Sequence, residues 1–220
     1  MVRVQNPNLE ILSLAVKQLG ELADEMVFVG GCATGLLITD SAAPPLRVTR
    51  DVDAIVQVVS LADYYVLSEK LRARGFAEDK SEDAPICRWI NENVILDVMP
   101  LDTRILGFGN QWYTPAAENA VSVQLPSGES IRMVSAPYFL ITKLEAFDGR
   151  GSGDYLASHD IEDIIAVLDG RPGIEAEVRQ AEPELAKHYQ SVFNGCCKTQ
   201  DLLNPYPGIC QQMKQARHVL

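Results

Sequence analysis

The sequence predicts a mixed α/β (α+β) fold that is followed by a purely helical part. In the first part, short apolar runs typical of β-strands alternate with segments in which apolar residues recur at helical spacing. From Pro137 onward only the helical spacing remains. We therefore expect two domains, an α/β core over 1–135 and a helical C-terminal subdomain over 136–220.

Composition places the chain among ordinary globular proteins. It has 220 residues, of which 47% are hydrophobic and 22% charged, which excludes intrinsic disorder and collagen-like structure. The longest apolar stretches, such as 35–38, are far shorter than the roughly 20 residues that span a bilayer. The first residues lack the apolar region of a signal peptide, and the five cysteines have no zinc-site or disulfide-framework spacing. We expect a cytoplasmic protein with reduced thiols and no membrane partner.

The chain is strongly acidic. Thirty acidic and 19 basic residues give a net charge of −11. Such a surface repels nucleic acid on average, which argues against a broad nucleic-acid groove but leaves room for a small basic patch that holds an RNA end. It suits a protein that collects divalent cations.

The elements of the first part follow from apolar spacing and from turn residues. Apolar residues three and four apart from Leu9 to Leu22 predict an amphipathic helix. Gly75 ends a later helix, and the polar residues 91–93 and 126–129 each join two β-rich runs as hairpins. The expected elements are helices over 8–24, 32–39 and 61–74 and strands over 26–29, 51–59, 86–90, 94–99, 121–125 and 131–133.

The helical part shows three further helix-period segments and a short tail segment. The expected helices cover 137–148, 158–169, 173–190 and 209–218. A glycine-rich loop over 149–153 lies within this part rather than between domains.

An Asp-Val-Asp segment is the most informative feature. Residues two apart on a strand point to the same side, so Asp51 and Asp53 project together from the face opposite Val52. Their separation of roughly 6–7 Å along the strand suits a pair of metal ions about 3.5–4 Å apart, as used in phosphoryl transfer. The alternative is a strand end that enters solvent, where aspartates are common.

Two glycines, Gly30 and Gly31, follow an apolar strand and open a helix. Their small size lets a phosphate approach backbone N–H groups at the helix N-terminus. The segment is not a Walker A loop, because Leu36 and Leu37 stand where Lys and Ser/Thr are required, and Cys32 replaces the second glycine of the dinucleotide fingerprint. Alternatively, the glycines serve the geometry of the turn alone.

Asp97 interrupts an otherwise apolar strand, where an unpaired carboxylate is costly to bury. One interpretation is a third metal ligand or a general base on a strand neighbouring Asp51 and Asp53. The other is a structural aspartate held by a hydrogen bond or by an arginine such as Arg88.

Together these residues resemble the nucleotidyltransferase superfamily of the DNA polymerase β type. The resemblance covers 26–99 and consists of a small-residue pair that opens a helix, Asp-x-Asp on the next strand and a further Asp on a later strand. It implies a mixed sheet with flanking helices and two bound Mg²⁺ ions, with Mn²⁺ as an alternative. It also implies a reaction of the EC 2.7.7 type, in which NMP moves from an NTP, ATP among them, to an acceptor.

The helical part is similar to the toxin nucleotidyltransferases of abortive-infection, type IV toxin–antitoxin systems. The similarity rests on Lys143 within 138–147 and on Asp160 within 158–164, and extends to about residue 171. It implies that these two residues complete the site and that an antitoxin protein is a partner. The acceptor would be an RNA end, such as that of tRNA, or a protein hydroxyl.

The residues themselves support this part of the site. Lys143 lies on the apolar face of its helix, so its ammonium must either pair, reach a cleft such as a triphosphate site, or escape to water. Asp160 suits the first turn of a helix that Ser158 caps, where acids offset the helix dipole. Asp163 fits that explanation less well, and the resemblance implies that Lys143 pairs with Asp160 and Asp163.

The resulting assignment combines metal, phosphate and acceptor roles. The candidate metal ligands are Asp51, Asp53 and Asp97. The candidate catalytic residues are Asp51, Asp53, Asp97, Lys143 and Asp160, and the candidate nucleotide-binding residues are Gly30, Gly31, Thr34, Thr49 and Lys143. In this scheme Asp97 activates the acceptor hydroxyl and Lys143 neutralises the triphosphate.

Two other functions remain open. A metal-dependent glycosyltransferase that takes a sugar nucleotide could also use Asp-Val-Asp, although Gly30 and Gly31 would then lack a role. A catalytically inactive module that binds nucleotide is the other. A metal phosphohydrolase with a His-Asp pair at His159 and Asp160 is disfavoured, because only two other histidines are present and both lie downstream.

Overall fold

The computed structural model describes residues 6–150 and 158–196 and contains a mixed sheet with strand order β3-β4-β5-β2-β1-β7-β6. The strands are β1 (Met26–Val29), β2 (Asp51–Val56), β3 (Ala77–Glu78), β4 (Arg88–Asn91), β5 (Val94–Pro100), β6 (Val121–Gln124) and β7 (Ser130–Met133). The helices are α1 (Pro7–Leu19), α2 (Thr34–Leu37), α3 (Leu61–Ala73), α4 (Thr103–Leu106), α5 (Tyr113–Glu118), α6 (Ala136–Arg150), α7 (His159–Gly170), α8 (Ile174–Gln180) and α9 (Pro183–Cys196), with 3₁₀ helices η1 (Gly20–Glu25) and η2 (Gly31–Ala33). The expected mixed α/β architecture is confirmed.

The register of the central strands decides where polar side chains meet. β2 runs parallel to β5, with Asp53 opposite Asp97, and antiparallel to β1, with Val29 opposite Asp53. Strand β1 therefore ends beside the Asp53 carboxylate, and the Gly30–Gly31 turn follows directly. Three segments that are far apart in the sequence thus converge on adjacent strands in the middle of the sheet.

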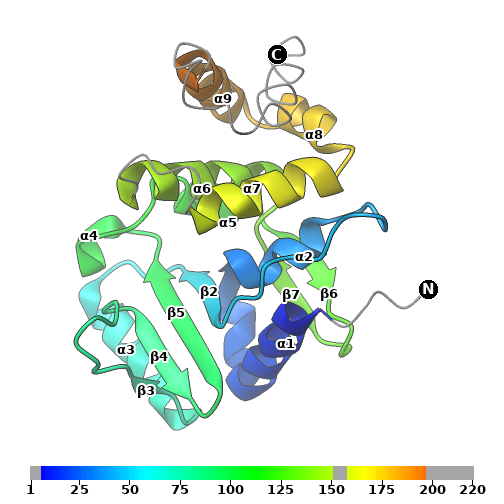
Figure 1. The fold of residues 1–220 in the computed structure, drawn as a ribbon. Coiled ribbons are helices and arrows are strands. Elements are labelled where there is room, and N and C mark those ends of the chain that lie inside the picture. Colours follow the sequence, from blue (N-terminus) through cyan, green and yellow to red (C-terminus); the bar gives the residue numbers. More distant parts are fainter. Residues whose placement is uncertain (1–5, 151–157, 197–220) are drawn as a thin grey trace.

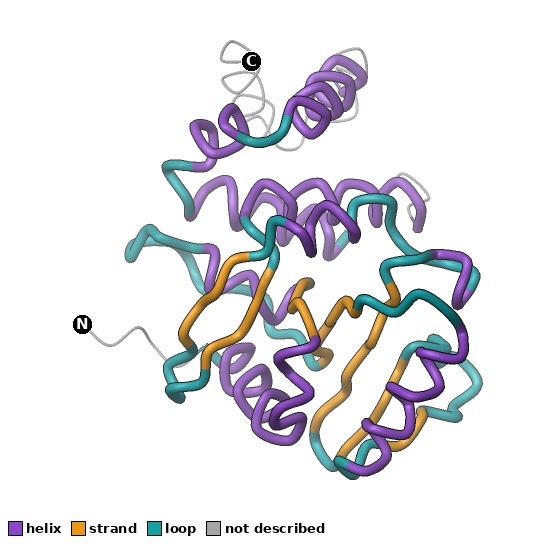
Figure 2. Tube along the Cα trace, turned by 180° about the vertical axis from the view of Figure 1, so that it is seen from behind, coloured by secondary structure: helices purple, strands orange, loops and turns teal. Residues whose placement is uncertain are grey.

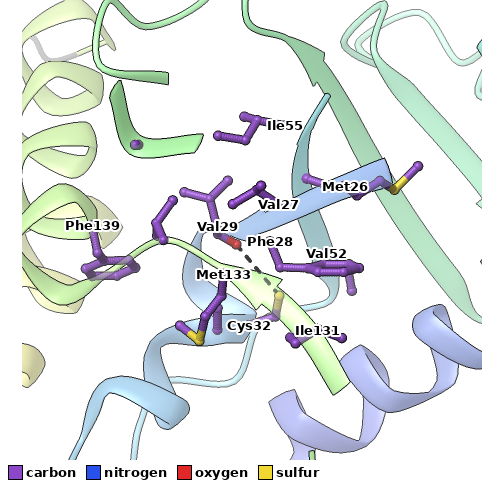
Figure 3. Close-up of a cluster of buried hydrophobic side chains, with 14 of the residues drawn as sticks. Met26, Val27, Phe28, Val29, Cys32, Val52, Ile55, Ile131, Met133 and Phe139 are labelled. Atoms are coloured by element: carbon purple, nitrogen blue, oxygen red, sulfur yellow. Dashed lines mark hydrogen bonds between the residues drawn. The ribbon is translucent and has the colours of Figure 1, made fainter. Parts of the chain in front are cut away.

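A buried apolar cluster holds the central strands in place (Figure 3). All four residues of β1 are buried, as expected for a central strand that is covered on both faces. Phe28 and Val52 are fully buried, and Cys32 packs beside them with its thiol donating a hydrogen bond to the carbonyl oxygen of Val29. This packing fixes the turn that carries the two glycines.

The helices after residue 135 form a layer beyond the sheet, with α6 and α7 side by side and α8 and α9 farther out (Figure 1). Seen from behind, the strands lie below this helical layer (Figure 2). Tyr189 of α9 donates a hydrogen bond to the carbonyl oxygen of Pro137, and Arg171 donates one to the carbonyl oxygen of Leu37. One cluster of buried side chains extends from Leu12 to Tyr189, and the division into two domains at residue 135 stays a prediction.

Several predicted boundaries were wrong. The helix expected over 8–24 ends at Leu19, because Gly20 takes φ 57°, a left-handed conformation that breaks the α-helix before η1. The helix expected over 32–39 is divided into η2 and α2. The helix expected over 173–190 is two helices, since Pro183 cannot continue α8 and instead begins α9.

Three short elements were not predicted, namely β3, α4 and α5. They span two to six residues, too few for a periodic apolar pattern to develop. The expected tail helix near 209–218 and most of the loop at 149–153 lie outside the described residues. Within the described ranges, no helix combines the length and the apolar character needed to cross a membrane.

Candidate active site

A cavity of about 730 Å³ opens beside the Asp-Val-Asp segment. Arg47, Thr49, Asp51 and Asp53 all line it, as expected for alternate residues of an extended chain. The intervening Val52 is fully buried on the opposite side. The alternation in the sequence therefore builds one polar wall of the cavity.

The facing wall comes from the helical part. Lys143 and Phe147 of α6 and Asp160 of α7 line the same cavity. The sheet and the helical layer thus contribute opposite sides of one site, so the two parts of the chain must be docked for the site to exist.

The turn after β1 is shaped to make room for Asp53. Gly30 has φ 78°, and a Cβ at this position would lie 1.9 Å from Oδ2 of Asp53. Any side chain would displace the carboxylate. Gly30 also lines an adjoining cavity of about 350 Å³ that shares Asp53 and Lys143 with the larger one.

Thr49 and Asn8 position the segment in front of β2. The Thr49 hydroxyl donates a 2.5 Å hydrogen bond to Oδ1 of Asp51. The buried Asn8 of α1 accepts from the Thr49 backbone N–H at 3.0 Å and donates to the Arg47 carbonyl oxygen at 2.8 Å. These bonds fix how Asp51 enters the cavity.

Asp97 lies beside Asp53, on the same cavity, and is paired with Arg88. Nε and Nη2 of Arg88 donate to Oδ1 and Oδ2 of Asp97 at 2.8 and 2.7 Å, and Nη2 lies 3.6 Å from Oδ2 of Asp51. This hydrogen bonding raises the pKa of Arg88 above its usual range. The expected pairing of Asp97 with an arginine is confirmed, and its role as a metal ligand or general base stays a prediction.

Lys143 is held between two carboxylates of α7. Its Nζ lies 3.1 Å from Oδ1 of Asp160 and 2.8 Å from Oδ2 of Asp163, which confirms the expected pairing. Burial alone would lower the pKa of Lys143, but the charges of Asp163 and Asp160 outweigh it, so the pKa is raised and the ammonium stays charged. The nearby Arg47 contacts Asp163 at 3.4 Å.

Most predicted site residues meet at these cavities, and one does not. Gly31 and Asp97 line the larger cavity with the residues already named, whereas Thr34 lines neither and is 1% exposed. The Thr34 side chain therefore does not reach either cavity, and nothing in the structure supports the phosphate-binding role predicted for it. Arg47 was missed, although its position two residues before Thr49 places it on the same side of the extended chain.

Among solved structures, an antigenic nucleotidyltransferase-like protein from Paracoccidioides brasiliensis resembles this chain. The alignment has a TM-score of 0.56 and 18% sequence identity, and covers 94% of this chain and 92% of that one. The chain has a nucleotidyltransferase-type fold. The antibiotic-resistance factor ANT(2'')-Ia aligns with a TM-score of 0.48 and 13% identity, over 90% of this chain and 99% of that one. No family model and no curated protein matches the sequence.

Two of the carboxylates fit the metal that the sequence resemblance implies. Asp51 and Asp53 supply oxygen donors at the cavity wall, the ligand type that Mg²⁺ and Mn²⁺ prefer. The space that Gly30 leaves open keeps the Asp53 carboxylate at this wall. Asp97 is engaged by Arg88, and within the described parts of the chain no three Asp, Glu, His or Cys side chains are already grouped to hold a metal.

Proposed function

We propose that this protein is a metal-dependent nucleotidyltransferase that moves NMP from an NTP to an acceptor hydroxyl. The observation that carries the proposal is the single cavity that brings Asp51 and Asp53 of β2, Asp97 of β5 and Lys143 of α6 together. Carboxylates on one wall and a charged lysine on the other suit a metal-bound triphosphate, whose transfer depends on positioning and electrostatic stabilisation.

Each residue has a role in this proposal. Asp51 and Asp53 would hold Mg²⁺, which when bound neutralises phosphate charge and polarises the reacting phosphoryl group. Lys143 offers an ammonium to the phosphates from the opposite wall. Asp97, next to Asp53 in the register, accepts the proton of the attacking hydroxyl. The Gly31 turn leaves room for the phosphates at the same cavity.

The acceptor that we propose is an RNA end or a protein hydroxyl, as in toxin nucleotidyltransferases. The charge of −11 disfavours a long nucleic-acid groove, and the cavity itself carries the cations Arg47, Arg88 and Lys143 beside its carboxylates. An RNA end presents few phosphates to the acidic surface, and the cations of the cavity are available to those few phosphates. A toxin role predicts that induced expression in bacteria arrests growth, and that Asp53→Asn abolishes the arrest.

The test uses two positions of the label. The protein is incubated with Mg²⁺, total RNA and cell protein, and with each of the four NTPs labelled at the α- or the γ-phosphate. Nucleotidyl transfer predicts that only the α-label enters the acceptor, and that transfer is lost in Asp53→Asn but kept in Asp24→Asn, an exposed aspartate in η1.

Other outcomes distinguish the alternatives. Transfer of the γ-label would instead indicate a kinase. Binding of NTP without any labelled product would favour an inactive nucleotide-binding module, and labelling from a UDP-sugar alone would favour a glycosyltransferase. Each of these results contradicts the proposal.

A further inference from the structure

Arg88 occupies a position that the proposed reaction must change. Its guanidinium binds both oxygens of Asp97 and also lies 3.6 Å from Oδ2 of Asp51. One cation therefore spans two of the four aspartates that line the cavity. A fixed positive charge at this place repels a divalent cation that approaches Asp97.

The contact is strong, and Arg88 is its more exposed partner. A bidentate arginine–carboxylate pair fixes geometry as well as charge, and Asp97 is 10% exposed in its side chain, against 24% for Arg88. Arg88 lines the same cavity as Lys143 and Gly31. A guanidinium that leaves Asp97 therefore remains inside the cavity, where phosphate oxygens are suitable bidentate partners.

We propose that Arg88 is a positioning residue that couples metal binding to nucleotide binding, by holding Asp97 until a triphosphate draws the guanidinium away. Without nucleotide, Arg88 supplies the positive charge at Asp97 and Asp51, and a metal ion binds only weakly. With nucleotide, Arg88 moves to the phosphates and Asp97 becomes available as a metal ligand and proton acceptor. This inference rests on the proposed function, because it takes an NTP as the ligand.

The coupling has a direct thermodynamic consequence. If nucleotide increases the affinity for metal, metal must increase the affinity for nucleotide by the same factor. Replacing Arg88 removes the positive charge that competes with the metal, so metal affinity no longer depends on whether nucleotide is bound. The expected signature is tighter metal binding in the absence of nucleotide and a smaller effect of nucleotide on metal affinity.

The experiment measures Mn²⁺ binding by the electron paramagnetic resonance signal of the free ion, with and without the non-transferable analogue α,β-methylene-ATP. For Arg88→Gln we expect Mn²⁺ to bind at least about fivefold tighter without nucleotide, and the enhancement by the analogue to fall by a similar factor. Arg179→Gln is the matched control, since it also removes an arginine paired with a carboxylate but lies in α8, away from the cavity. It should leave Mn²⁺ affinity unchanged.

Two further variants keep the inference testable. In Arg88→Gln/Asp97→Asn the gain should disappear, because the carboxylate that Arg88 blocks is gone. Arg88→Lys keeps the charge but cannot bond both Asp97 oxygens, so it should show a smaller gain in Mn²⁺ affinity. If Arg88→Gln does not fold, the result for Arg88→Lys tests the inference in its place. Unchanged or weaker Mn²⁺ affinity in the folded Arg88 variants, or an undiminished gain without Asp97, would overturn the inference.

The experiments distinguish failure of the proposed function from failure of the proposed role of Arg88. If the Mn²⁺ coupling is present but no α-label is transferred to any acceptor, the coupling role stands and the proposed reaction is wrong. If transfer occurs and Mn²⁺ affinity does not depend on Arg88, the reaction stands and the coupling role is wrong.

Discussion

Asn8 of α1 bonds the backbone of Thr49 and so ties the N-terminal helix to the segment that leads into Asp51. The Thr49 N–H donates to Oδ1 of Asn8 at 3.0 Å, and the Asn8 amide donates to the carbonyl oxygen of Arg47 at 2.8 Å. Asn8 is 1% exposed. Asn8, which precedes Thr49 by 41 residues, thus helps to set the position of the first aspartate of the site.

We predict that Asn8→Ala impairs both stability and the proposed activity. The change leaves a buried N–H without its acceptor, which costs about 1–3 kcal/mol in the free energy of unfolding. The loosened segment also misplaces Asp51, so nucleotidyl transfer should fall more than the folded fraction does. Urea unfolding and transfer rates measured on the same samples check this. An Asn8→Ala protein with full stability and full activity would contradict it.

Lys143→Met should destabilise the fold strongly. It removes the ammonium that lies between the buried Asp160 and Asp163, while Arg47 stays 3.4 Å from Asp163, and breaking such a buried pair costs about 3–5 kcal/mol. The control is Lys17→Met, because Lys17 is exposed and lies 3.9 Å from Glu129, a type of pair worth about 0–1 kcal/mol. Urea unfolding compares the two, and equal losses would contradict a structural role for the buried pair. Adding Asp163→Asn should recover part of the loss.

Gly30→Ala should displace Asp53, and Gly107→Ala is the control at a glycine where an added Cβ meets nothing. Gly30 and Gly107 have nearly the same φ, 78° and 79°, but an added Cβ meets Asp53 only at Gly30 and nothing within 4 Å at Gly107. Gly107 has ψ 4°, so alanine there carries the left-handed backbone cost of about 1–2 kcal/mol. Gly30 has ψ −171°, a conformation that essentially only glycine adopts, so alanine there carries a backbone cost of about 1–3 kcal/mol. Only Gly30→Ala should lower transfer, by about 100-fold, the scale that misplacement of a reacting group by 1 Å produces. Similar rates in the two variants, measured by label transfer, would count against this role of Gly30.

Because the Cys87 thiol is buried, we predict that the protein loses stability at alkaline pH. Burial raises the pKa of the Cys87 thiol from 9.0 to about 12, with a further contribution from the charge of Asp97. Between these two values the unfolded chain releases the thiol proton and the folded chain keeps it, so the free energy of unfolding falls as pH rises. The slope from this group approaches about 1.4 kcal/mol per pH unit. Urea unfolding at pH 8.5 and 10.5 should show a shallower decline for Cys87→Ala than for the wild type, and identical declines would contradict it.

The parts of the site that could be predicted are those set by local geometry. Asp51 and Asp53 share a side because a strand alternates, and Lys143 stands out because a charge on an apolar helix face needs partners. The same alternation includes Arg47, which was missed because residues 47–50 precede the assigned strand. The boundary at Leu19 was missed because the left-handed conformation of Gly20 is not visible in apolar spacing.

The remaining features depend on long-range pairing. Arg88 reaches Asp97 only through the register of β4 against β5, and Asn8 reaches Thr49 only through the docking of α1. From the sequence alone, Arg88 was one possible partner of Asp97, and nothing singled out Asn8. Thr34 shows the opposite error. It lies three residues after Gly31 and was predicted to contact phosphate, but its side chain is buried and does not reach the cavity.

The central claim is that Asp51 and Asp53 carry out metal-dependent nucleotidyl transfer, and the most direct measurement is the single-turnover transfer of α-labelled NTP. The rate in Asp53→Asn is compared with those in the wild type and in Asp24→Asn, after thermal unfolding has shown that all three proteins are folded. The account predicts that the Asp53 variant is slower by at least about 1000-fold, the scale of losing a principal transition-state contact, and that the Asp24 variant is unchanged. Equal rates for the two variants would contradict it.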